Sequence, residues 1–252
     1  GIISILLPIT VAQFMNKKNI VIKVVLSLIF IFVIGEIGTK TPVLSLLITF
    51  LVSFIYFMIR SLKKKNYKIF TGLLIILTSV TVTSFLVVPK TNFYKNIMIH
   101  VKYLKLDSVD DIFENDYVFD HFIFSQRITF LKNTSNRYNK ASLKNKLFGI
   151  GYVNKNGKEY KAIEMDYYDV FYNHGILGFI VYFSVYIYSL YLVFKNLAKK
   201  IDFKQLMEYL SLILVLILSL HSGHIITTPA VCIYVVIILK KLINNKANFM
   251  NE

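Results

Sequence analysis

The chain has few cysteines, few acidic residues and few charged residues overall, and each shortage excludes a class of protein. Of its 252 residues, 17% are charged and 56% are hydrophobic. An ordinary soluble domain has about 25% charged and about 45–50% apolar residues. This composition excludes a soluble globular enzyme, a disordered protein and a nucleic-acid-binding domain with a conventional core. Cys232 is the only cysteine, so an intrachain disulfide is impossible and we expect no cysteine-built metal site.

Long apolar runs dominate the rest of the chain. A membrane-spanning helix needs about 20 mostly apolar residues, and four segments meet this requirement: 20–37, 42–59, 69–88 and 176–194. The apolar stretch 210–239 is interrupted at 221–224 and by Pro229. We therefore predict two short helices, at about 207–222 and 225–240, joined by a tight turn. Residues 1–15 have the pattern of an incomplete helix, so we expect the chain to be a C-terminal fragment of a larger protein.

The basic residues fall in alternate loops between these runs. The chain has 29 Lys and Arg residues against 14 Asp and Glu. On one side, three to five basic residues gather in each of the segments 17–23, 60–68, 195–204 and 240–246. The opposite side has Glu36 and Lys40 in one turn and no Lys, Arg, Asp or Glu from 221 to 229. The positive-inside rule assigns the basic side to the cytoplasm and the long segment 89–169 to the outside.

These patterns predict an all-α polytopic membrane protein with about seven membrane segments and one long extracytoplasmic loop domain. Residues 1–88 are expected to form membrane-spanning helices, the first of them partial. Residues 89–169 are expected to form the loop domain, and residues 170–252 further spanning helices and a cytoplasmic tail. The predicted location is the cytoplasmic membrane, with the lipid bilayer around the helices.

The outer segment has helix and turn patterns of its own. Apolar residues recur at helical spacing from Phe93 to Leu104, which predicts an amphipathic helix on the outer membrane surface. Ser125 is a candidate N-cap for a helix that carries Arg127 in its first turn.

Three later patterns complete the loop. Residues 135–147 are predicted to form another helix, which Gly149 ends. Asn156-Gly157 is a strong signal for a two-residue β-hairpin turn. A last short helix is expected from about Met165 to His174, where Gly175 breaks it before the next span.

Several short motifs follow one another on the predicted outer side. They are Gly38-Thr39-Lys40-Thr41, Ser125-Gln126-Arg127, Phe148-Gly149-Ile150-Gly151, and Glu164-Met165-Asp166-Tyr167-Tyr168-Asp169 leading into Gly175-Ile176-Leu177-Gly178. Their order and spacing, over about residues 30–195, resemble the O-antigen ligase and polysaccharide polymerase family of multi-spanning membrane glycosyltransferases. That family often has Arg where Lys40 stands and His where Glu164 stands. The Glu-x-Asp pattern resembles members from low-GC Gram-positive bacteria.

The resemblance implies that the protein transfers a glycan from an undecaprenyl diphosphate carrier onto a sugar hydroxyl. Arg127 would bind the diphosphate with two parallel hydrogen bonds, and Lys40 would add a point charge. Glu164 or Asp166 would accept the proton of the attacking hydroxyl. Two residues that stand two apart on a helix point in different directions. The expected catalytic set is therefore Arg127 with one of these two carboxylates.

The implied partners are a lipid-linked glycan donor, a glycan acceptor and other polysaccharide-assembly proteins, and nucleic acid is not among them. No cofactor or metal is expected: His221 and His224 share a helical face but lack a clear third ligand, so hydrogen bonding in the turn is favoured.

Other readings of the function stay open. Polymerase is preferred to ligase if the source is Gram-positive, because such cells lack the lipopolysaccharide acceptor of O-antigen ligases. A non-enzymatic transporter or flippase of lipid-linked glycans is disfavoured, since no predicted span carries an ionisable residue at mid-membrane. A structural membrane subunit would show no dependence on Arg127.

Overall fold

The computed structural model describes residues 1–15, 20–106, 110–153, 157, 160–197 and 201–249. Within these residues the regular structure is helical, with no β-strand, which confirms the all-α prediction at this level. In chain order the elements are α1 (Ile2–Met15), α2 (Ile20–Ile37), α3 (Lys40–Lys63), α4 (Tyr67–Val87), the 3₁₀ helix η1 (Val88–Lys90), α5 (Asn92–Tyr103), the 3₁₀ helix η2 (Asp110–Phe113), α6 (Asp116–Phe119), the π-helix η3 (Asp120–Phe124), α7 (Arg127–Asn139), α8 (Leu143–Phe148), α9 (Asp166–Leu197), α10 (Phe203–His221) and α11 (Pro229–Phe249).

The chain divides into two compact units. The N-terminal unit comprises residues 3–106 and 202–210, and the C-terminal unit comprises residues 1–2, 107–201 and 211–252. Most of the predicted loop domain therefore belongs to the same unit as α9, α11 and the second half of α10. The boundaries predicted at 88 and 169 concern membrane topology and stay a prediction.

Three helices in the described part of the chain are long and apolar enough to cross a membrane: α3, α9 and α10. Two shorter apolar helices cover Ile2–Met15 and Tyr67–Ser79. On α3, Leu47, Leu51 and Ile55 recur every four residues and are each more than half exposed. Such a stripe of apolar side chains is unfavourable in water and suits contact with lipid tails. The remaining predicted spans stay predictions.

In the N-terminal unit, hydrogen bonds from α5 hold the turn between α2 and α3. The side-chain amide of Asn96 donates to the Gly38 carbonyl (3.0 Å), and that of Asn92 donates to the Glu36 carboxylate (2.8 Å). Gly38 has φ +65°, a left-handed conformation that favours glycine. Lys40 begins α3 two residues later, so this turn fixes its place in the unit. α5 is the helix predicted from the Phe93–Leu104 pattern, which is thereby confirmed as a helix.

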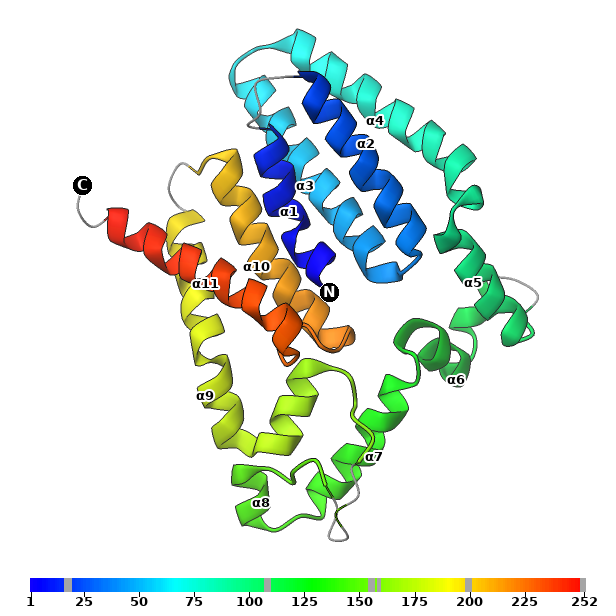
Figure 1. Cartoon of the computed structure of the whole chain (residues 1–252), viewed down its shortest axis with the longest axis vertical. Coiled ribbons are helices and arrows are strands. Elements are labelled where there is room, and N and C mark those ends of the chain that lie inside the picture. Colours follow the sequence, from blue (N-terminus) through cyan, green and yellow to red (C-terminus); the bar gives the residue numbers. More distant parts are fainter. Residues whose placement is uncertain (16–19, 107–109, 154–156, 158–159, 198–200, 250–252) are drawn as a thin grey trace. The chain divides into compact units, whose positions relative to one another are not determined.

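In the C-terminal unit, α8 and the first part of α9 lie side by side (Figure 1). Gly149 ends α8, and the backbone N–H of Ile150 donates to the Tyr172 carbonyl (2.9 Å). A Cβ atom at Gly149 would lie 2.0 Å from the Asn173 carbonyl oxygen, and one at Gly175 would lie 2.4 Å from the Leu147 carbonyl oxygen. Gly175 also kinks α9, with φ +69° and ψ −172°, at the predicted break.

Two predicted helix boundaries are wrong. Residues 135–147 do not form one helix, because α7 ends at Asn139 and α8 begins only at Leu143. Ser142 lies extended between them, and its hydroxyl accepts the backbone N–H of Asn145 (3.4 Å) as the N-cap of α8. The last helix begins at Pro229 rather than near 225, since proline is favoured at a first helical position.

The predicted hairpin falls partly outside the described residues. Asn156 lies outside the described residues. Gly157 has φ +74°, and the backbone N–H of Tyr160 donates to the Tyr152 carbonyl (2.8 Å).

Candidate active site

Arg127 is the first residue of α7, and the start of this helix is built differently from the prediction. Ser125 and Gln126 both adopt left-handed conformations, with φ +54° and +67°, and neither side chain caps the helix. The Asp120 carboxylate instead accepts the backbone N–H groups of Ile128 (2.9 Å) and Thr129 (3.0 Å) and the Thr129 hydroxyl (2.8 Å). The prediction that Ser125 caps this helix is therefore wrong. A carboxylate at this end also interacts favourably with the helix dipole.

The Arg127 guanidinium contacts two groups that are distant in the sequence. Its Nη1 donates to the His221 carbonyl (3.1 Å), and its Nη2 lies 3.4 Å from Oε2 of Glu164. Lys161 places its Nζ 3.4 Å from the other Glu164 oxygen. The Nε of Arg127 is buried and has no hydrogen-bond partner among the described residues. The result is a carboxylate between two cations, one of which keeps an unused donor.

The three side chains of this cluster differ in their exposure to solvent. The side chain of Arg127 is 20% exposed and that of Glu164 33%, whereas Lys161 is 62% exposed. Charges in partly buried surroundings interact more strongly than charges in bulk water, because the effective dielectric constant is lower. Glu164 and Arg127 still have contact with solvent, so a ligand can reach both.

Glu164 has an uncommon backbone conformation that its neighbours fix. Its φ is +61°, which is rare for a residue other than glycine, asparagine or aspartate. The N–H groups on either side of it, from Ile163 (3.0 Å) and Met165 (3.2 Å), both donate to the Asp169 carboxylate. Non-glycine residues in such conformations cost about 1–3 kcal/mol and persist only where surrounding contacts hold them.

Asp166 faces a different set of groups. Its side chain accepts hydrogen bonds from the backbone of His224, Ile225 and Ile226 (2.8–2.9 Å) and from the Thr227 hydroxyl (2.6 Å). Asp166 is 1% exposed and follows Glu164 by two residues, but its carboxylate is filled by these four donors.

The structure brings together some of the predicted residues. Arg127 and Glu164 meet, while Asp166 lies next to Glu164 in sequence and binds the 222–228 segment. Lys40 belongs to the N-terminal unit and is not part of this cluster, which is built within the C-terminal unit. His221 and His224, for which hydrogen bonding in the turn was predicted, lie in the same region. The His221 carbonyl accepts a hydrogen bond from Arg127, and the backbone N–H of His224 donates to Asp166.

Sequence reasoning missed four contributors: Lys161, Asp120, Asp169 and the His221 carbonyl. Only Lys161 had a local signal, because it stands three residues before Glu164 with opposite charge. Asp120 and Asp169 accept hydrogen bonds from backbone N–H groups, which every residue type except proline has. The His221 carbonyl is also a backbone group, so the sequence gives no signal for any of these three contributors.

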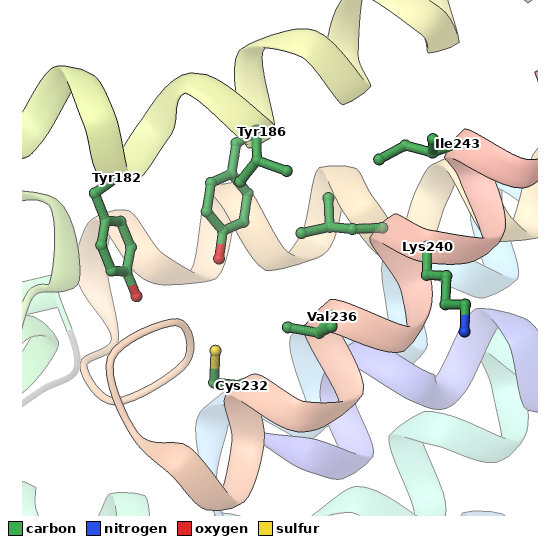
Figure 2. Close-up of a pocket in the computed structure, with 8 residues that line it drawn as sticks. Tyr182, Tyr186, Cys232, Val236, Lys240 and Ile243 are labelled. Carbon is green, nitrogen blue, oxygen red and sulfur yellow. The ribbon is translucent and has the colours of Figure 1, made fainter.

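A separate groove lies between α9 and α11 (Figure 2). It encloses about 430 Å³, within the range of ligand pockets, and its lining is mostly apolar: Tyr182, Val185, Tyr186, Cys232, Val236, Leu239, Lys240 and Ile243. None of these residues belongs to the Arg127 cluster. Among the described residues, no group of three or more His, Cys, Asp or Glu side chains could hold a metal ion.

Comparison with known proteins identifies a family. The family described as O-antigen ligase like membrane protein matches residues 109–248, more than half of the chain. The matched region includes Arg127, Glu164, Asp166 and the 222–228 segment, whereas Lys40 lies outside it. The chain has no significant match among curated proteins or among solved structures.

Proposed function

Because this chain belongs to the O-antigen ligase-like membrane protein family, we propose that it is a membrane glycosyltransferase that polymerises or ligates lipid-linked glycan units into a cell-surface polysaccharide. The family resemblance predicted from short motifs is confirmed over residues 109–248. Together with the candidate spans, this membership makes the chain an integral membrane protein. The family includes glycosyltransferase-like ligases and polymerases and suggests lipid-linked glycan substrates.

The pairing of Arg127 with Glu164 carries the proposal. Transfer requires the oxygen of an acceptor hydroxyl to bond to the anomeric carbon of the donor sugar. The bond from that carbon to the undecaprenyl diphosphate then breaks, and its electron pair leaves with the diphosphate oxygen. A guanidinium is suited to the growing negative charge, and one such donor contributes roughly 3–4 kcal/mol in comparable sites.

Glu164 is our choice for the general base. The hydroxyl proton needs an acceptor with solvent contact and an unfilled lone pair, and Glu164 is one-third exposed. A bound diphosphate would compete with Glu164 for Arg127, which would release the carboxylate to accept the proton. General base catalysis of this kind contributes about 10²–10⁴-fold. Asp166 was an equal candidate by sequence, but four donors already occupy its carboxylate.

Lys40 stays a proposed second contact to the diphosphate. The proposed location stays the cytoplasmic membrane, with residues 89–169 outside. Labelling of single cysteines in a Cys232→Ser background tests the topology. Asn133→Cys should react with an impermeant thiol reagent in intact cells, and Asn66→Cys should not. Labelling at 66 without labelling at 133 would put Arg127 on the wrong side for this function.

The deciding experiment uses the purified full-length protein in lipid vesicles with a lipid-linked repeat unit. We expect longer glycan chains and free undecaprenyl diphosphate, and we expect Arg127→Ala to lower turnover by roughly 10²-fold. Arg127 lies outside the candidate spans α3, α9 and α10, so membrane abundance should stay normal. Full elongation by Arg127→Ala at normal abundance would refute the leaving-group role.

A transporter of lipid-linked glycans is the alternative that one observation favours. Glu208 lies in the second turn of the candidate span α10 and is 2% exposed. Ionisable residues buried in spans often serve coupled transport. A transporter would move the lipid-linked donor across the vesicle membrane without lengthening any glycan, so the same assay separates the two functions.

A further inference from the structure

The first turn of α9 carries two buried carboxylates, three residues apart. Asp166 is 1% exposed and Asp169 is 7% exposed. Among the described residues neither forms an ion pair; their hydrogen-bond donors are backbone N–H groups and one hydroxyl. A carboxylate at a helix start is stabilised by the helix dipole and by such donors. Both side chains are therefore suited to holding other segments of the chain in place.

Asp166 holds the segment 222–228, which joins α10 to α11. Oδ1 accepts from His224 and Thr227, and Oδ2 accepts from Ile225 and Ile226. This segment begins immediately after His221, whose carbonyl accepts a hydrogen bond from the Arg127 guanidinium. A shift of the segment would therefore move the carbonyl that orients Arg127.

Asp169 holds the residues on both sides of Glu164. The two held segments also touch one another, since a Cβ atom at Gly223 would lie 2.3 Å from the Glu164 carbonyl oxygen. The backbone at 223 thus packs directly on the backbone of Glu164. Asp166 and Asp169 together fix a contact between the segment that orients Arg127 and the residue that pairs with it.

We propose that Asp166 and Asp169 are positioning residues for the Arg127–Glu164 pair. Asp166 orients Arg127 through the 222–228 segment and the His221 carbonyl. Asp169 fixes Glu164 through its two neighbouring N–H groups. For its turnover readouts this inference rests on the proposed glycosyltransferase function, but its structural readout does not.

The first test measures glycan elongation by full-length variants in vesicles. Asp166→Asn replaces an acceptor oxygen by an amide donor that faces N–H groups. We expect this variant to bind the lipid-linked glycan more weakly, which would raise KM. We expect kcat/KM to fall by about 10²-fold, the usual cost of a misplaced catalytic group. Asp169→Asn should lower kcat with little change in KM, because it displaces Glu164 and leaves Arg127 held.

Two further variants act on the segment and leave both carboxylates intact. Thr227→Val removes one of the four bonds to Asp166, and Gly223→Ala forces the two backbones apart. Both should lower kcat/KM, with Thr227→Val the milder at about fivefold, the value of one hydrogen bond. Asp116→Asn, which changes an exposed carboxylate of α6, is the matched control and should behave as wild type.

The second test needs no activity. In a Cys232→Ser background, a cysteine at Ile226, which is 0% exposed, should react slowly with a thiol reagent. Asp166→Asn should raise that rate at least tenfold, whereas Asp116→Asn should leave it unchanged. An unchanged rate in Asp166→Asn would overturn the proposal, whether or not the protein elongates glycans. Loss of kcat with KM and labelling unchanged would overturn it too, by identifying Asp166 as the base.

Discussion

The two ends of α7 each carry a partly buried arginine, and the two arginines have different surroundings. Arg127, at the first residue, contacts the Glu164 carboxylate and the His221 carbonyl. Arg137, in the last turn, lies with its guanidinium carbon 3.5 Å from the centre of the Tyr160 ring, and it donates to the Thr134 hydroxyl (3.2 Å). Each has one buried nitrogen without a hydrogen-bond partner among the described residues.

The two arginines show what distinguishes a cation that can bind an anionic ligand from one that only packs. The two groups that contact the Arg137 guanidinium, the Tyr160 ring and the Thr134 hydroxyl, are neutral, so Arg137 packs without an ion pair among the described residues. Arg127 has an anionic neighbour that a ligand of greater charge could replace, so it is able to exchange partners. Both are partly buried arginines of the same helix, and they differ in the charge of the groups that contact the guanidinium.

The largest difference between the two arginines should appear when each is changed to lysine. Arg127→Lys keeps the charge but loses the planar two-point grip on a phosphate, so we expect a marked fall in glycan elongation that is smaller than the fall in Arg127→Ala. Arg137→Lys should stay within about threefold of wild type, since exposed or partly exposed cation–π contacts contribute only about 0.5–1 kcal/mol. Equal losses in kcat/KM for the two variants would remove the distinction between the two ends of α7.

Glu164→Gln sharpens the comparison by removing the anionic neighbour alone. We expect turnover to fall by about 10²-fold or more, because the amide is not a base. Binding of the lipid donor should not weaken, since Gln competes less with the diphosphate for Arg127. Glu114→Gln, at an exposed site of the same unit, is the control. Weaker donor binding by Glu164→Gln, measured in vesicles, would argue that Glu164 itself binds the donor.

Asp120→Ala tests what holds the Arg127 end of α7 in place. Loss of an N-capping side chain costs about 0.5–2 kcal/mol, so the Tm of the purified protein should fall and elongation should fall with it. Ser125→Ala should leave both unchanged, because the Ser125 hydroxyl caps no helix in the described part of the chain. A larger loss of Tm in Ser125→Ala than in Asp120→Ala would reverse this assignment.

Tyr160→Leu should have the smallest effect. It removes the ring under Arg137 and is expected to lower the free energy of unfolding by about 0.5–1 kcal/mol, visible as a small decrease in Tm. Elongation should be unchanged at equal abundance. A loss of elongation larger than the loss of stability would give the Arg137 end of α7 a role in binding the glycan.

Local patterns predicted the parts of the molecule that depend on a few neighbouring residues. The breaks at Gly149 and Gly175 and the helix from Asn92 to Tyr103 follow from glycine conformation and apolar spacing. Motif order predicted Arg127 together with one of two carboxylates, Glu164 or Asp166, but the contact between Arg127 and Glu164 comes from the structure.

Other features depend on contacts between distant segments. Asp166 binds donors 58 to 61 residues away, and this binding keeps 222–228 out of α11. The Asp120 carboxylate reaches backbone N–H groups eight and nine residues ahead, a spacing that no capping pattern covers. In both cases most of the donors are backbone groups, which have no sequence signature, so the mistaken N-cap could not have been corrected from the sequence. The start of α11 could have been corrected, because Pro229 marks a first helical position.

The contact between Gly149 and Gly175 has a consequence for genetics. A Cβ atom at Gly149 would overlap the backbone at Asn173, and one at Gly175 would overlap the backbone at Leu147. A saturation screen scored by surface polysaccharide would therefore rank both glycines with Arg127, although neither carries a reactive group. Scoring the same library by membrane abundance would separate them: the glycine variants should disappear from the membrane, and the Arg127 variants should remain there without product.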